Sequence, residues 1–498
     1  MNIKKLLSCA LLGLPMLALA RPASPEVMTM TNPDGSIVSF RLHGNEDFNF
    51  CTDPDYTTIL ERNAEGYLKP AFRNGRMLTT NIADLNLLRS ESLPLIQQRT
   101  EAINRMAQLD KDGRSTYTTV GEVPGLVILI EYADTPFTCE DPLDQFTRLC
   151  NEPGYSDYGS VGSARDYYID ASNGLFRPTF DVYGPVKLSH PRAFYTRYGT
   201  DEYDEKNANA YFGYAIQEAV KSLESTVDFK KYDVDDNGVI DNIFFFFSGR
   251  GQNDTFDRSC IWPHQADFLR YTVDPQWGGI GLDPLVVDGV TVRTYACSCE
   301  LNSNPKIPSD PWIDGIGAFV HEYGHVLGLP DVYDVLNTGT DTPGAFDVMD
   351  TGSYNLLSAR PPMFSAYEKW LCNWLEFDEA VNNTKYTLPS ISTGKDAKAV
   401  RIRTLKPGGK PSNEYFIFES RTAEGWDTSL SQNGILIWHI NYDQKLWEEN
   451  RVNVNKMANI RIVRPEQDNR TFVVWPGDDN AYTYLTPETP DFKLTPYK

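Results

Sequence analysis

Positive charge is scarce in this sequence. The 498 residues carry 46 Lys and Arg against 68 Asp and Glu, a formal net charge of −22. Phosphate backbones and anionic lipids repel so acidic a chain, so we expect no nucleic acid and no anionic membrane surface among its partners. Hydrophobic residues still make up 41% and aromatic residues 12%, enough to build packed cores. A chain of this length predicts several folded units rather than one.

Long apolar runs are missing after the first twenty residues, so we expect no membrane-spanning helix there. The chain begins with Lys4 and Lys5, continues with an apolar stretch from Leu6 to Leu19, and reaches small residues at Ala18-Leu19-Ala20. This pattern is typical of a secretory signal peptide. We therefore expect cleavage near Ala20, an extracellular or periplasmic location, and a soluble monomer.

Cysteine is also sparse, with eight residues in the chain, one of them in the signal segment. The odd number left after cleavage implies at least one unpaired thiol. Cys139 and Cys150 are spaced for a short-loop disulfide, and Cys260 could pair with Cys297 or Cys299. The spacing leaves the connectivity open.

Histidine is rarer than cysteine, with six residues in the chain, yet two of them fall in one short motif. Residues 321–334 read HEYGHVLGLPDVYD, which is H-E-x-x-H-x-x-G-x-x-D. On a helix, His321 and His325 lie one turn apart on one face, so both imidazoles can reach one metal ion. Glu322 projects beside them, where it can hold a metal-bound water. Two neutral nitrogens, one further ligand and an open position predict a hydrolytic zinc site.

The residues around the motif support a helix with a forced ending. Asp314 is placed to cap the helix, and apolar residues recur at helical spacing through it. Gly328 follows where a helix ends in a left-handed residue, and Pro330 prevents its continuation. The alternative is a buried helix whose histidines bond to the backbone, but such a helix has no use for a forced turn followed by an acid.

Two residues compete for the third zinc ligand. The turn at Pro330 can bring Asp331 back toward the metal, and a carboxylate is a permitted zinc ligand. Glu368, in the predicted helix Met363–Trp374, is the alternative, by analogy with zincins that take a glutamate from a later helix. We expect Asp331 to be the ligand.

A second metal site is predicted in the acidic segment 233–241. Oxygen ligands occur at alternate positions, followed by a glycine and a further acid, as in calcium loops of the EF-hand type. The predicted calcium ligands are Asp233, Asp235, Asn237 and Asp241, with the carbonyl of Val239. Phe244 stands where an EF-hand has its bidentate glutamate, so the match is incomplete. The alternative is a solvated acidic turn.

Hydrophobic periodicity predicts where the N-terminal part of the chain ends. Residues 30–70 alternate between apolar and polar, which predicts a small antiparallel β unit. The polar stretch 110–116 is expected to be exposed, and a proteolytic cut there would release what precedes it. We therefore expect a β-containing prosegment at 21–117, after a signal peptide at 1–20.

The rest of the chain is expected to form two units. Buried strands at 125–132 and 242–248, an amphipathic helix at 207–223 and the zinc helix at 315–328 predict a peptidase domain. This domain, residues 118–376, should have an α/β or α+β fold of the zincin type with an active-site helix. Short strands from residue 384 onward predict a mostly β C-terminal domain at 377–498.

Through most of residues 120–455 the chain resembles the immune inhibitor A family of secreted bacterial metallopeptidases. The segments that carry the resemblance are 321–334, 233–241, 261–264, 346–353, 366–371 and 434–441. It implies a metzincin-like methionine turn beneath the zinc, for which Met349 fits. It also implies a zymogen whose prosegment blocks the zinc with a side chain, for which Cys51, Asp34 and Glu46 are candidates.

The expected reaction is zinc-dependent hydrolysis of internal peptide bonds in proteins. Glu322 is the expected general base for the zinc-activated water, and it passes the proton to the leaving amine. The zinc polarises the carbonyl, and Tyr354 or His264 is the expected second stabiliser of the oxyanion. Histidines without a motif around them are expected to be structural or exposed; these are His43, His190 and His439. The rivals are an exopeptidase or other zinc amidase, and a calcium-stabilised binding protein with an inactive zinc helix.

Overall fold

The computed structural model describes most of the chain from Leu19 to Val463. The described residues are 19–46, 48–63, 65–91, 113–199, 211–272, 280–303, 312–381, 384–393, 396–430, 433–454, 458–463 and 492–493. The predicted signal segment before Leu19, the start of the predicted helix 207–223 and part of the exposed stretch 110–116 lie outside them.

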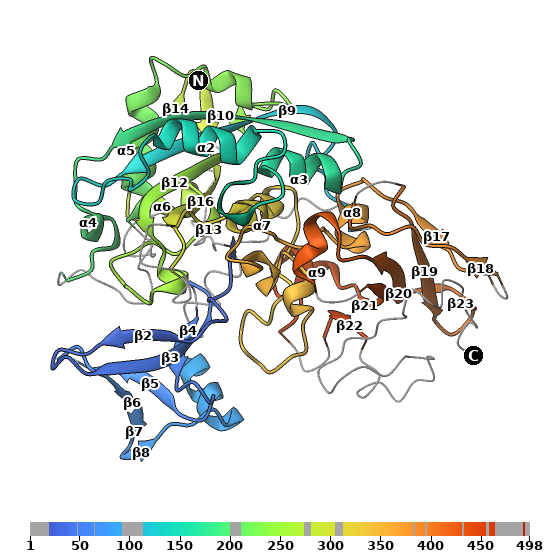
Figure 1. Ribbon diagram of the computed structural model, residues 1–498, viewed down its shortest axis with the longest axis horizontal. Helices are drawn as coiled ribbons and strands as arrows, with labels where there is room; N and C mark the ends of the chain where they lie inside the picture. Colours follow the sequence, from blue (N-terminus) through green and yellow to red (C-terminus); the bar gives the residue numbers. More distant parts are fainter. Residues whose placement is uncertain are drawn as a thin grey trace, which may run out of the picture.

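A six-stranded mixed sheet forms the centre of the molecule (Figure 1). Its order is β1 (Leu19–Ala20), β13 (His264–Asp267), β16 (Thr294–Leu301), β12 (Ile243–Arg250), β9 (Gly121–Glu131) and β10 (Phe176–Lys187). The strands from β16 to β10 pair in parallel, whereas β13 is antiparallel to β16. The predicted strands 125–132 and 242–248 become β9 and β12. Their continuous apolar runs reflect burial on both faces of the sheet.

Helices cover both faces of this sheet. Side chains such as Leu129 and Phe246 face α2 (Pro142–Asn151), α3 (Ala164–Ala171) and α7 (Ile316–Val326). The alternate side chains, such as Ile128 and Phe245, face α5 (Phe212–Leu223) on the opposite side. The mixed α/β fold with an active-site helix is therefore confirmed.

Helix α7, which carries the H-E-x-x-H motif, begins and ends for reasons partly visible in the sequence. Gly328 has a φ of +94°, and its N–H donates to the carbonyl of His325, as the C-cap prediction required. The predicted cap by Asp314 is wrong, because the N-cap is Gly315 without a side-chain bond. A Cβ at Gly315 would lie 2.2 Å from the Ser358 carbonyl oxygen, so close packing requires glycine there.

The C-terminal strands form a five-stranded sheet that shares its core with the peptidase domain. The order is β17 (Phe377–Glu379), β19 (Ala399–Leu405), β20 (Pro411–Arg421), β21 (Gly434–Asn441) and β22 (Ile460–Ile462). Trp438 of β21 and Phe319 of α7 belong to one buried hydrophobic cluster. The predicted β-rich character is confirmed, and this sheet also supports the catalytic helix.

A buried ionic network joins the two units. Arg421 pairs with Glu419 at 2.7 Å and Asp427 at 3.1 Å, and it donates to the Met363 carbonyl at 2.8 Å. Glu419 also accepts from the N–H of Ala366, the first residue of α8 (Ala366–Leu371). This helix is shorter than the predicted 363–374 because Ser365 caps its start.

The N-terminal unit is a separate antiparallel sheet, drawn in blue in Figure 1. Its order is β2 (Met28–Thr31), β3 (Ile37–Gly44), β4 (Asn49–Thr52), β5 (Ile59–Arg62) and β6 (Leu68–Pro70). A short hairpin follows, formed by β7 (Phe72–Arg73) and β8 (Arg76–Met77). Residues 19–24 precede this unit in the chain. They lie against the central sheet, where β1 pairs with β13.

The disulfide expectations are wrong for the described residues. Cys139, Cys150, Cys260, Cys297 and Cys299 are all free thiols. Two of them have local contacts: the Cys297 thiol lies 3.4 Å from His264 Nδ1, and the Cys299 thiol donates to the Leu301 carbonyl.

None of the helices in the described part of the chain has the length and apolarity needed to cross a bilayer.

We expect Arg421→Met to lower the free energy of unfolding by about 3–5 kcal/mol, because it leaves two buried carboxylates without their cation. Arg403→Met on the same sheet is the control, since Arg403 is 33% exposed and 3.6 Å from Glu379. It should cost less than about 1 kcal/mol. Urea unfolding measures the free energy of unfolding of both variants. An equal loss in the two would show that the buried network is no more important than a surface ion pair.

Candidate active site

The two motif histidines are held in one tautomer by the backbone. Nδ1 of His321 lies 2.8 Å from the Val348 carbonyl, and Nδ1 of His325 lies 2.8 Å from the Leu329 carbonyl. A carbonyl can only accept, so both Nδ1 atoms carry the proton. Each neutral ring therefore directs the lone pair of Nε2 into the same space, which is the orientation that a metal ligand needs.

Asp331 brings a third acceptor to the same point. Its Oδ1 lies 3.2 Å from Nε2 of His321 and 3.3 Å from Nε2 of His325. All three side chains are almost completely buried, and none of the three atoms has a hydrogen-bond partner. Three converging acceptors without a donor are unfavourable unless a cation lies among them. Their chemistry, two imidazoles and a carboxylate, fits zinc.

Asn450 of the C-terminal unit fixes the orientation of Asp331. Its amide donates to Asp331 Oδ2 at 2.6 Å, and its carbonyl oxygen accepts from the Asp331 N–H, also at 2.6 Å. This two-point contact leaves Oδ1 directed at the histidines. No sequence pattern indicates Asn450, which lies 119 residues further along the chain.

Glu322 lies beside the metal-ligand group. One carboxylate oxygen accepts from the backbone N–H of Arg21 at 2.9 Å, and the other is buried without a partner. Burial raises the pKa of Glu322 well above its usual range, although the Arg21 N–H opposes the shift. The ligand atoms of His321, Glu322 and His325 all lie within 4.8 Å of one another, so the glutamate belongs to the same cluster.

The predicted methionine turn packs under the catalytic helix. A Cβ on Gly324 would lie 2.8 Å from Met349 Sδ, so the glycine lets Met349 approach α7 closely. The preceding residue, Val348, supplies the carbonyl that orients His321. The turn therefore positions one of the histidine rings.

The competing ligand Glu368 lies elsewhere. Its carboxylate accepts from the Ser365 N–H at 2.6 Å and forms a capping box at the start of α8. Burial raises its pKa above the usual range. The structure thus brings Asp331, and not Glu368, to the two histidines.

The predicted calcium loop has a compact conformation of its own. Asp233 accepts from the N–H groups of Asn237 and Gly238, and Asp241 accepts from the Val234 N–H. Burial raises the pKa of Asp241 to about 6, with the charges of Asp235 and Asp233 adding to the shift. The calcium site stays a prediction.

The segment Leu19–Ser24, hereafter the cleft segment, covers the metal-ligand group. Ala20, in the edge strand β1, pairs with His264 of β13. The Ala20 carbonyl accepts from Tyr333 Oη at 2.6 Å, and the Arg21 carbonyl accepts from Trp262 Nε1 at 2.8 Å. The sequence analysis did not identify Tyr333 or Arg21, although Tyr333 stands only two residues after Asp331.

His264 and Tyr354, the two candidates for the second stabiliser of the oxyanion, have different surroundings. His264 is fully buried, and its nitrogens lie 2.7 Å from the Trp262 carbonyl and 2.6 Å from Tyr295 Oη, which is a structural role. Tyr354 donates to the Pro22 carbonyl at 2.6 Å, one residue beyond Arg21. It therefore contacts the cleft segment, whereas Tyr333 contacts the carbonyl nearest Glu322.

The three predicted zinc-blocking residues do not lie in the metal-ligand cluster. Cys51 is buried within the N-terminal unit, and Asp34 is an exposed turn residue bonded to Ser36. Glu46 lies in the turn between β3 and β4 of the same unit. The backbone N–H of Arg21, and not one of these side chains, touches Glu322.

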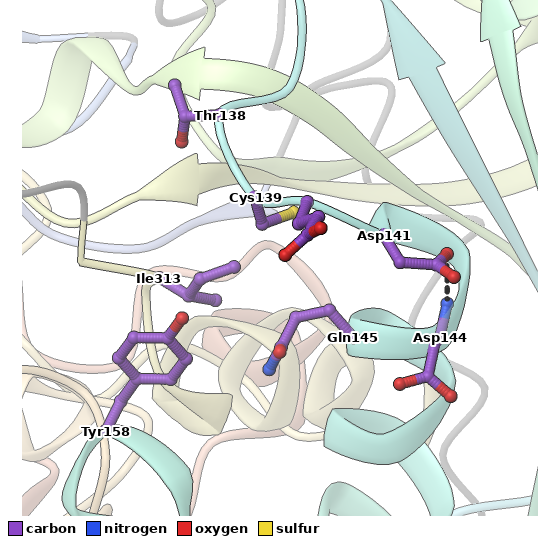
Figure 2. A pocket seen from close by; sticks show the side chains of 8 residues that line it. Thr138, Cys139, Asp141, Asp144, Gln145, Tyr158 and Ile313 are labelled. Atoms are coloured by element: carbon purple, nitrogen blue, oxygen red, sulfur yellow. Dashed lines mark hydrogen bonds between the residues drawn. The ribbon is translucent and has the colours of Figure 1, made fainter.

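A hollow of about 770 Å³ lies at the surface near Ile313 (Figure 2). Its lining is largely polar and acidic: Thr138, Cys139, Glu140, Asp141, Asp144, Gln145, Tyr158 and Ile313. Ile313 directly precedes Asp314, so the hollow adjoins the start of the catalytic helix.

Together, the buried acceptors, the glutamate beside them and the antiparallel strand β13 have the arrangement of a zinc metallopeptidase site. A family description, "Immune inhibitor A peptidase M6, catalytic domain", matches residues 125–376. The chain belongs to the immune inhibitor A peptidase M6 family, as the resemblance in the sequence predicted.

Two relatives show how far the similarity extends. Pre-pro-metalloprotease PrtV of Vibrio cholerae serotype O1 is 22% identical over 357 residues, which cover 62% of this chain and 37% of that protein. Immune inhibitor A of Bacillus thuringiensis subsp. alesti is 26% identical over 277 residues, which cover 49% of this chain and 38% of that protein. The chain thus spans less than half the length of either relative.

We expect Asp331→Ala to lose stoichiometric zinc, because it removes one of three converging acceptors. Glu368→Gln should keep the metal, since Glu368 caps a different helix. Zinc content per chain after gel filtration measures both. Retention of zinc by Asp331→Ala would contradict this ligand set.

We expect Asn450→Gly to weaken zinc affinity by about 10–100-fold, the usual cost of losing an outer-shell partner. Glycine suits the φ of +48° at this position, so the change removes the side-chain bonds without adding backbone strain. Asn74→Gly, at a φ of +52° in an exposed turn, is the matched control. Competition with a fluorescent zinc chelator measures the affinity, and an unchanged value for Asn450→Gly would exclude a positioning role.

Proposed function

We propose that this chain is a secreted zinc endopeptidase that hydrolyses internal peptide bonds of proteins. The observation that supports this most strongly is the position of its own Ala20–Arg21 peptide bond. The carbonyl of that bond faces Tyr333 Oη at 2.6 Å, and its N–H faces Glu322 at 2.9 Å. A substrate bond in this position would have a donor at the developing oxyanion and a carboxylate at the leaving nitrogen.

Each side chain then has a definite role. His321, His325 and Asp331 would hold zinc, which when bound supplies a Lewis acid and a more acidic water. Glu322 accepts the proton of the attacking water and returns it to the leaving amine, whose position the Arg21 nitrogen marks. Tyr333 donates to the carbonyl oxygen as negative charge develops there.

The path of the cleft segment favours cleavage within a chain over removal of a terminal residue. Backbone contacts continue on both sides of the Ala20–Arg21 bond. On one side, Leu19 and Ala20 pair with β13. On the other, the Pro22 carbonyl meets Tyr354 and the Ser24 N–H donates to the Asn253 carbonyl. A cleft that binds backbone in both directions suits an endopeptidase.

We further propose that residues 21–117 are a prosegment that keeps the enzyme latent. The N-terminal sheet carries the cleft segment directly into the site, where it takes the place of a substrate. Cleavage of the signal peptide near Ala20 would leave the new α-amino group of Arg21 beside Glu322. Removal of the prosegment, for example by a cut at 110–116, would then open the cleft.

Calcium binding at Asp233, Asp235, Asn237 and Asp241 is part of the proposal. The loop follows the short helix Phe229–Tyr232 and precedes the buried strand β12. Like charges raise the pKa of Asp241 beyond the effect of burial, and a divalent cation would relieve that repulsion.

We expect full-length protein to digest casein after trimming near residue 115, and Glu322→Gln to lose at least about 10³-fold in kcat because it removes the general base. A zinc chelator should abolish the activity, and added zinc should restore it. Gel electrophoresis of casein fragments measures the outcome. A Glu322→Gln variant with full activity would exclude this mechanism.

The same casein assay distinguishes the roles of Tyr333 and Tyr354. Tyr333→Phe should lower kcat by about 10²-fold, the effect of losing one oxyanion donor. Tyr354→Phe is the matched control, and it should mainly raise KM because its hydroxyl contacts backbone one residue beyond the bond. The reverse result would return the oxyanion role to Tyr354, as the sequence analysis expected.

A further inference from the structure

The side chain of Arg21 fills a fully buried pocket beside the proposed scissile position. The Arg21 side chain is 1% exposed, and its guanidinium forms an ion pair with Asp314 at 2.9 Å. It also donates to the Ser353 carbonyl at 3.0 Å and to the Ser358 hydroxyl. A fully buried cation is costly unless it is paired and hydrogen-bonded, and these partners provide both.

The pocket matches the shape of a guanidinium as well as its charge. The ring of Tyr354 lies against the planar group, with 3.5 Å from the Arg21 Cζ to the ring centroid. Asp314 is itself held by Asn302, whose amide donates to its second oxygen at 2.8 Å. Stacking on an aromatic ring and donation in several directions suit arginine better than the compact ammonium of lysine.

The pocket lies where the side chain of one particular substrate residue would bind. Arg21 contributes the nitrogen of the bond that lies between Tyr333 and Glu322. Its side chain therefore occupies the place of the first residue on the leaving-amine side. The walls come from residues next to the catalytic machinery, since Asp314 directly precedes the N-cap of α7 and Ser353 follows the methionine turn.

We propose that this pocket is the primary specificity site on the leaving-amine side and that Asp314 makes it select arginine. The proposal rests on the proposed peptidase function, because it takes the cleft segment to lie as a substrate does. Preferred protein substrates would then have arginine immediately after the cleaved bond. Acidic residues would be excluded by repulsion from Asp314, and short apolar residues would leave its buried carboxylate without a cation.

Binding can be tested without turnover. The full chain with Arg21→Ala, freed of metal by a chelator, is titrated with a fluorescent peptide of residues 19–24, Leu-Ala-Arg-Pro-Ala-Ser. A second peptide carries citrulline, the neutral isostere of arginine. We expect the arginine peptide to bind at least about tenfold more tightly, because only it forms the charge-assisted contacts with Asp314.

Asp314→Asn in the same background should remove the difference between the two peptides, and Ser358→Ala should reduce it. Asp181→Asn is the matched control, because Asp181 forms its ion pair with Lys231 from the opposite edge strand β10. It should preserve the difference. Equal binding of the two peptides to the Arg21→Ala chain, or a difference that survives Asp314→Asn, would overturn the proposal.

Turnover then separates this proposal from the proposed function. Trimmed, zinc-loaded enzyme is given quenched peptides that have Arg, Leu or Glu after the cleaved alanine. A kcat/KM at least about tenfold higher for Arg, lost in Asp314→Asn, supports both proposals. Cleavage of all three at similar rates keeps the peptidase and overturns the pocket. Charge-dependent binding without any cleavage keeps the pocket and overturns the peptidase.

Discussion

Three hydrogen-bond acceptors point at one another in the interior of this protein, and much of the structure serves to hold them there. Oδ1 of Asp331 lies 3.2 Å from Nε2 of His321 and 3.3 Å from Nε2 of His325, without a donor among the three atoms. Such an arrangement persists only if its surroundings fix each group or a cation balances it. The carbonyls of Val348 and Leu329 fix the rings, and Asn450 fixes the carboxylate.

This constraint explains why the C-terminal sheet is joined so closely to the peptidase domain. Asn450 comes from the segment after β21, and Asn453 donates to the carbonyl of Val332, next to Asp331. The shared hydrophobic core and the buried Arg421 network keep that segment in register with α7. The sheet is therefore part of the catalytic site rather than an appended module.

The same site explains the path of the N-terminal segment. An edge strand offers unpaired backbone groups, and β13 satisfies them by pairing with Leu19 and Ala20. Once the backbone lies there, Arg21 meets Glu322 through its N–H and Asp314 through its guanidinium. One residue thus connects the general base to a charged pocket, so latency and substrate preference would depend on the same contacts.

The sequence by itself determined the local chemistry. H-E-x-x-H at helical spacing places two imidazoles and a carboxylate on one turn, and Gly328 with Pro330 ends the helix; both follow from backbone geometry. Apolar runs and alternation likewise predicted the buried strands and the β-rich C-terminal part. Prediction was weaker where a residue could serve in more than one way. Asp314 was predicted to cap the helix but forms an ion pair with Arg21. The cysteines were predicted to form disulfides but are free thiols.

Only the tertiary structure decided which distant residues complete the site. It brought Asp331 rather than Glu368 to the histidines, supplied Asn450 from 119 residues away, and placed Arg21 against Glu322 across 301 residues. These contacts depend on strand order and on how the units pack, and no periodic pattern encodes them. A motif can specify the residues that its own helix aligns, whereas long-range partners are set by the fold that closes around it.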